Sequence, residues 1–201
     1  MNFIVNDLYN YIDKYMSSVE PKLFFAGASA VYALMYPIGD KLLKISSKKY
    51  STYDTGRKYY ILSNILKSVV LSFITYVFGL SVYHKHISLT DTSKWADKDY
   101  TLKNISAIYI VTDFVALLLN REKMMNSTIF HHICVCLSYF YIYNANLAKE
   151  GIYKGIIMYG GFSSIPAIVN FYLGSRFLTN SKTKIYIMKK IAFIVYLFSC
   201  T

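Results

Sequence analysis

Apolar residues dominate six long stretches of the chain, and short basic segments separate them. A membrane-spanning helix needs about 17 to 25 mostly apolar residues, because it rises about 1.5 Å per residue through a hydrocarbon core about 30 Å thick. We therefore expect an all-α, polytopic transmembrane helical bundle with about six spans. The predicted spans are Leu23–Gly39, Tyr59–Tyr83, Asn104–Asn120, Met124–Ala148, Gly155–Ser175 and Ile185–Thr201.

The two ends of the chain differ from this pattern. Residues 1–22 carry apolar side chains at helical spacing, which predicts an amphipathic helix at the membrane interface; the alternative is a frayed terminus. Residues 23–47 are expected to form the first span and a basic linker, and residues 48–201 the main transmembrane domain. Near the other end, eleven residues follow Lys190, so either the last helix is short or the chain stops before its natural end.

Composition agrees with a membrane protein. Hydrophobic residues make up 55% of the chain, charged residues only 16%, and the mean hydropathy is +0.33. Soluble domains carry about 25% charged residues. This composition excludes a water-soluble globule and a disordered chain.

The placement of Lys and Arg predicts the orientation. Counted over alternate loops, thirteen lie on one side of the membrane and eight on the other. Cytoplasmic loops carry the excess of positive charge, so we expect a lumenal N-terminus. The net charge of +11 would then face anionic lipid head groups, and we expect no nucleic-acid partner.

Four ionisable residues lie inside predicted spans: Lys67, Asp113, His131 and His132. Each is costly there and therefore a candidate functional residue. Asp113 and His131 each lie seven residues, or about 11 Å, from the same membrane face. Counted from that face, Lys67 lies about 12 Å deep and Asn170 about 8 Å deep. Because four helices place polar groups at one level, we expect a hydrated pocket open to the cytosol.

Each of these residues also has a structural interpretation. Lys67 could extend to the interface, and Asp113 could pair with Lys67 or Arg121 or stay protonated. The histidines could form hydrogen bonds between helices. As chemistry, Asp113 could orient His131 or His132 as a base or nucleophile.

Pro166 interrupts the fifth predicted span. It lacks a backbone N–H, so it is expected to kink the helix and free a carbonyl that Ser163, Ser164 or Asn170 could satisfy.

We expect no metal site. Adjacent histidines on a helix point about 100° apart, and the sequence places neither a second carboxylate nor a cysteine at the same depth. His84 and His86 could bind a metal elsewhere, but a third ligand is not evident, and a solvated loop pair is the favoured interpretation.

Three motifs in this order resemble the TLC-domain family, which includes ceramide synthases, translocon-associated proteins and lipid-homeostasis proteins. They are the run from Tyr109 to Phe114 around Asp113, the sequence Phe130-His131-His132-Ile133, and the run Ser163–Asn170. The chain looks most like the small, uncharacterised TLC-domain transmembrane proteins, over residues 48–201. The resemblance implies a helical domain of the endoplasmic reticulum membrane with a cavity for lipid chains.

The same resemblance implies that His131 and His132 match a histidine pair that takes part in acyl transfer in ceramide synthases. Those enzymes also carry an acidic Asp-x-Ser-Asp element, where this chain has Gly160-Gly161-Phe162-Ser163-Ser164 without a carboxylate.

Three functions follow as hypotheses. The leading one is a lipid-homeostasis protein that binds or senses a lipid through Lys67, Ser163, Ser164 and Asn170, with membrane lipids as partners and no cofactor. The second is an acyltransferase that uses His131, His132 and Asp113, with acyl-CoA as co-substrate. The third is a translocon- or cargo-associated factor.

Overall fold

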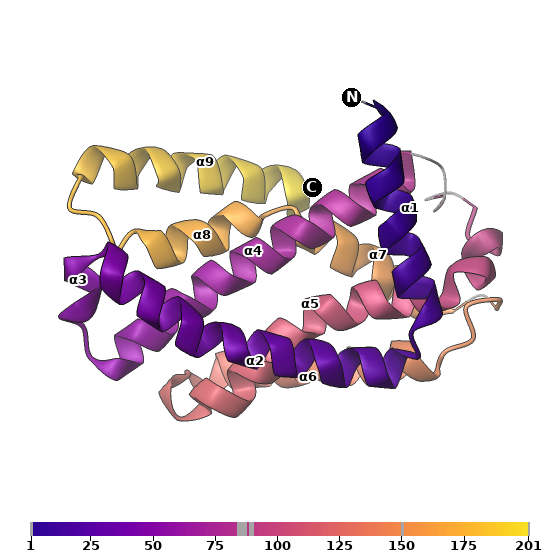
Figure 1. The fold of residues 1–201 in the computed structure, drawn as a ribbon, viewed down its shortest axis with the longest axis horizontal. Helices are drawn as coiled ribbons and strands as arrows, with labels where there is room; N and C mark the ends of the chain where they lie inside the picture. Colours follow the sequence, from indigo (N-terminus) through magenta and orange to yellow (C-terminus); the bar gives the residue numbers. More distant parts are fainter. Residues whose placement is uncertain (1, 84–87, 89–90, 150, 201) are drawn as a thin grey trace.

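The protein is built from helices packed side by side (Figure 1), in a computed structural model that describes residues 2–83, 88, 91–149 and 151–200. No strand occurs among these residues, so the all-α prediction is confirmed for them. The elements are α1 (Asn2–Ser18), α2 (Pro21–Ser46), α3 (Lys48–Ser51), α4 (Thr55–Tyr83), the 3₁₀ helix η1 (Ser93–Lys98), α5 (Asp99–Asn120), the 3₁₀ helix η2 (Arg121–Lys123), α6 (Asn126–Asn144), α7 (Ile152–Ser164), α8 (Ala167–Ser175) and α9 (Lys182–Cys200).

Within the described part of the chain, three helices are long and apolar enough to cross a membrane. They are α2, α4 and the run Trp95–Asn120, which contains α5; the pair α7 and α8, bent by 45°, adds a fourth if it forms one span. Helices also occupy the remaining predicted stretches as α6 and α9. However, α9 carries four lysines, and α6 contains two histidines and has an asparagine at each end. Three or four spans are thus supported, and six remain a prediction.

Side-chain caps set the start of two long helices. The Glu20 carboxylate accepts the Leu23 N–H at 3.0 Å, and Pro21 occupies the first turn of α2, where its missing N–H costs nothing. Asp54 accepts the Arg57 N–H at 2.9 Å and caps α4 in the same way. Because α2 starts at Pro21, the residues before Glu20 form a separate helix, α1, which ends at Ser18.

The predicted kink lies at Pro166. α7 ends at Ser164 and α8 begins at Ala167, so the fifth predicted stretch is two helices. Beside the break, the Ser163 hydroxyl donates to the carbonyl of Gly160 at 3.1 Å, and the Ser164 hydroxyl to that of Gly161 at 2.6 Å. The carbonyl of Phe162, four residues before Pro166, instead accepts the Ile165 N–H at 3.1 Å. The hydroxyls of Ser163 and Ser164 thus bond carbonyls beside the bend, but not the one that Pro166 was expected to free.

α5 lies at the centre of the bundle and positions the candidate site. In its most apolar stretch 61% of the residues are buried, against 11% in that of α2. α5 packs against α1, α2, α4, α6 and α7. Near its start, the buried Asn104 side chain donates to the carbonyls of Met16 at 2.7 Å and Val19 at 3.0 Å. These bonds fasten the bend between α1 and α2 to the central helix.

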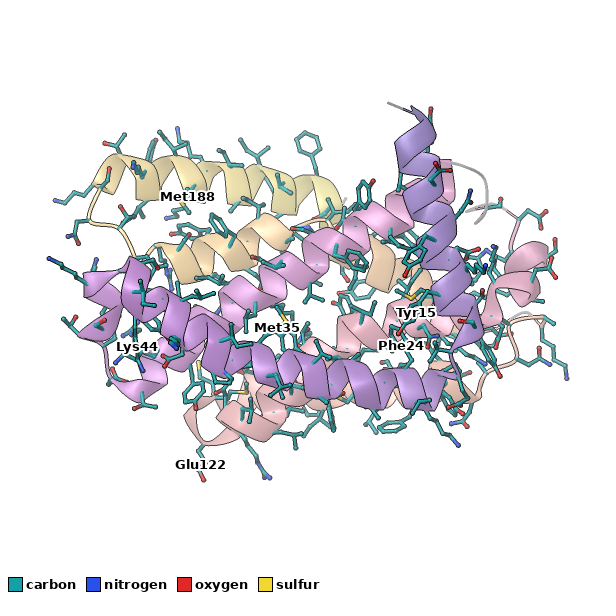
Figure 2. The ribbon with its side chains drawn as sticks, viewed as in Figure 1. Tyr15, Phe24, Met35, Lys44, Glu122 and Met188 are labelled. Carbon is teal, nitrogen blue, oxygen red and sulfur yellow. The ribbon has the colours of Figure 1, made fainter. Side chains whose placement is uncertain are left out.

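The long elements alternate in direction, so charged loops gather at two ends of the bundle (Figure 1). Lys44 and Glu122 lie toward one end, and Tyr15 and Phe24 toward the other (Figure 2). The loops of the first end, residues 40–58, 121–123 and 176–190, contain thirteen Lys or Arg and three Asp or Glu. The remaining loops and the N-terminal segment contain eight and seven. We call the first end the basic end.

Candidate functional site

A buried ion pair joins α4 to α5. The Lys67 Nζ lies 2.5 Å from Asp113 Oδ1. The Asp113 side chain is completely buried, and that of Lys67 is 19% exposed. Because a buried carboxylate is costly without a positive partner, Lys67 is the group that keeps Asp113 charged in the bundle. Of the interpretations left open for Asp113, the structure shows the pair with Lys67.

Both histidines of α6 approach the same carboxylate. The His132 Nδ1 lies 2.6 Å from Asp113 Oδ1 but outside hydrogen-bond alignment, so their interaction is a close polar contact. His132 is buried and His131 is exposed, with 5.6 Å between their ring centroids. The sequence-predicted residues Lys67, Asp113, His131 and His132 therefore meet at one place, as their depths predicted.

A hydrogen-bonded group lies between this site and the basic end. Ser63, one turn before Lys67, lies 2.9 Å from the hydroxyl of Tyr36 and accepts the side-chain N–H of Asn120 at 2.9 Å. Ser63 and Lys67 share a face of α4, and Asp113 and Asn120 share a face of α5. Polar side chains thus continue along the α4–α5 interface toward the basic end.

Ser163 and Ser164 belong to a separate polar group at the bend between α7 and α8. The Ser163 hydroxyl lies 3.0 Å from the hydroxyl of Tyr109, and Ser164 lies 2.9 Å from Thr75 Oγ1. Asn170 is half-buried on α8, and its side chain makes no hydrogen bond with described residues. The expected gathering of all these groups is therefore divided: the bend residues do not contact Asp113.

An apolar pocket reaches this site at His131, whereas Lys67, Asp113 and His132 do not line it. The empty space in and before it is about 660 Å³, which includes open solvent at its mouth. Aliphatic and aromatic side chains of α4, α5, α6 and α7 line it, together with His131 and Tyr109. On α6 the lining positions run from His131 to Ile142, about 16 Å along the helix axis. The pocket is therefore elongated parallel to the helices.

A second, more polar pocket opens at the basic end. Tyr36, Asp40, Lys44, Lys58 and Tyr59 contribute to its walls. Because Tyr36 also bonds Ser63, this pocket meets the polar group that leads toward Asp113. The ion pair therefore lies between a polar pocket and an apolar one.

The site also contains three groups that could ligate a metal ion. Asp113, His131 and His132 each offer one ligand atom, and these atoms lie within 4.8 Å of one another. The Lys67 ammonium already lies beside the carboxylate, however, and repels a second cation. The expected divergence of the two histidines is thus not observed, and the absence of a metal stays a prediction. His84 and His86 lie outside the described residues.

Sequence reasoning missed the side chains that extend the site. Tyr109, Ser63, Asn120 and Tyr36 were not predicted as site residues, although Tyr109 and Asn120 lie four and seven residues from Asp113 on α5. This same-face spacing was a usable signal. The partnership of Tyr36 with Ser63, twenty-seven residues later, could not be read from spacing.

Comparison with known proteins does not place the chain. No family model, curated protein or solved structure matches it.

The Lys67 and Asp113 charges are expected to depend on each other. Lys67→Met or Asp113→Asn alone leaves one buried charge unpaired and should lower stability by about 3 kcal/mol. The double variant should lose much less than the sum of the two single losses. Thermal unfolding in detergent, analysed as a double-mutant cycle, measures this coupling.

The exposed pair of Asp40 and Lys44 is a matched control, because it has the same 2.5 Å separation. Its side chains are 32% and 49% exposed, so the corresponding cycle should give about 0 to 1 kcal/mol. Equal coupling in both pairs would contradict a buried, interdependent ion pair.

Proposed function

We propose that this protein is a multi-pass membrane protein of lipid homeostasis, which binds or senses a lipid chain in the apolar pocket beside Lys67, Asp113 and His132. The observation that carries this proposal is an elongated apolar pocket with His131 in its wall, next to Asp113 and His132. The pocket lies between helices that include candidate membrane spans. An amphiphile has the same division, because its chain needs an apolar wall and its polar group needs partners. The resemblance to TLC-domain proteins points the same way.

Filling the pocket should displace its ligand. Gly160 lines the pocket, and a Cβ at this position would meet open space. Gly160→Leu should therefore fit without a clash and lower the amount of lipid that co-purifies in mild detergent several-fold. Quantitative lipid mass spectrometry, normalised to protein, measures the change.

Gly155→Leu provides the control, since Gly155 lies on the same helix, also faces open space, and does not line the pocket. It should retain the bound lipid of the parent. Equal lipid content in both variants, or no lipid above the detergent background in the parent, would exclude the proposal.

Acyl transfer is the second candidate function. His131 lines the apolar pocket, while its neighbour His132 contacts Asp113. An acyl chain in the pocket would thus lie beside an imidazole, which can act as a base or nucleophile. Acyl-CoA would be the co-substrate in this case.

Labelled acyl-CoA separates the two functions. An enzyme should transfer label to lipid, and joint replacement of His131 and His132 by Ala should lower the rate by about 10²-fold or more. A binding protein should show no transfer in the parent, and the same replacement should reduce only co-purified lipid.

The proposed orientation places the basic end in the cytosol and the N-terminus in the lumen of the endoplasmic reticulum. The support is the excess of Lys and Arg at one end of the bundle. This orientation includes the six-span arrangement, in which successive loops lie on opposite sides of the membrane.

Two single substitutions test the orientation. Asp91→Asn would complete an acceptor sequence with Thr92 and Ser93 at the proposed lumenal end, and Ser181→Asn would complete one with Thr183 at the basic end. Translation with microsomes, with the natural acceptor sequences at Asn104 and Asn126 removed, should give a glycan mass shift for the first variant only. A shift for Ser181→Asn alone would reverse the orientation.

A further inference from the structure

Two arginines come together around one aromatic ring at the basic end. Phe177 lies two residues after Ser175, where α8 ends. The Arg57 Cζ lies 4.7 Å from the centroid of the Phe177 ring. The Arg176 Cζ lies 4.8 Å from the same centroid. The Tyr53 hydroxyl donates to the Phe177 carbonyl at 3.0 Å, which holds this segment against the start of α4. We call Arg57, Arg176 and Phe177 the arginine clamp.

The guanidinium groups of the clamp are not neutralised. No carboxylate among the described residues forms an ion pair with Arg57 or Arg176. Asp54, the nearest acid in sequence, instead caps α4 through the Arg57 backbone N–H. The Arg176 Nε is buried without an acceptor, and its Nη2 has only a 3.5 Å contact with Tyr60. Two positive charges with free donors therefore lie within 5 Å of one ring.

We propose that the arginine clamp binds the phosphate of an anionic phospholipid. Guanidinium groups match phosphate oxygens through paired, charge-assisted hydrogen bonds, and both planes can rest on the Phe177 ring while their edges donate. The surrounding loops supply thirteen Lys or Arg against three Asp or Glu, which attracts an anion to this end.

Position and surroundings favour a lipid as the source of the phosphate. The clamp lies where α4 begins and α8 ends, so it lies at the end of helices apolar enough to cross a membrane. The ring of Tyr60, whose centroid lies 5.9 Å from that of Phe177, is 40% exposed. Aromatic side chains at the end of a span are typical of head-group depth. This site is separate from the apolar pocket and does not rest on the proposed chain binding.

Native mass spectrometry of the full chain in detergent tests the clamp, with dioleoyl phosphatidic acid as probe and dioleoyl phosphatidylcholine as the neutral reference. The parent should bind phosphatidic acid more tightly. Arg57→Gln combined with Arg176→Gln should weaken this binding at least about tenfold, the effect of losing one charge-assisted hydrogen bond. Lys182→Gln combined with Lys184→Gln removes the same charge from the same end and should change binding less than about twofold.

Two further measurements keep the result decisive. Arg57→Lys with Arg176→Lys keeps the charge but loses the planar donors, and it should lose most of the binding while it stays folded by its melting curve. Inorganic phosphate at the same concentration should not compete with the lipid. The proposal would be overturned if the Arg57→Gln, Arg176→Gln variant and the Lys182→Gln, Lys184→Gln variant lost phosphatidic acid binding equally. Equal binding of phosphatidylcholine by the parent, or full competition by inorganic phosphate, would also overturn it.

Discussion

The buried charge of Asp113 is the constraint on which the centre of this bundle depends. A carboxylate with no solvent exposure needs a positive partner, and Lys67 on the neighbouring helix supplies it at 2.5 Å. This requirement fixes the register of α4 against α5, because the two side chains can meet only at one relative height. Ser63 and Asn120 form their hydrogen bond in the same register.

The central position of α5 explains why several elements contribute to one site. α5 packs against α4 on one side and α6 on another, so the Asp113 carboxylate can contact Lys67 and His132 together. The same helix lines the apolar pocket through residues one to three turns earlier. A polar centre and an apolar wall therefore arise from different levels of a single helix, which suits the proposed binding of an amphiphile.

The two ends of the bundle differ in their charge. One end concentrates basic residues and presents Arg57 and Arg176, which form no ion pair with a described carboxylate, although it also pairs Lys44 with Asp40 at 2.5 Å. At the other end Lys98 pairs with Asp13 at 2.6 Å and Lys103 with Asp99 at 2.9 Å. Paired charges cancel locally, and unpaired ones remain available to a ligand. The total charge alone does not describe this difference.

The sequence by itself determined the helical class, the places of the helices, the break at Pro166 and the common depth of Lys67, Asp113 and the histidines. These follow from hydropathy, from the missing proline N–H and from the constant rise of a helix, all of which are local properties. The support for three or four spans, where six were expected, shows that length and apolar content identify α9 and α6 less securely. Only the tertiary structure decided which helix faces meet. It paired Asp113 with Lys67 and placed Ser163 beside Tyr109 and Ser164 beside Thr75. It also brought Arg57 to Phe177, over a hundred residues away in the sequence. Depth along a helix can be counted from the sequence, but rotation about its axis and the choice of neighbour are set by packing among all the helices.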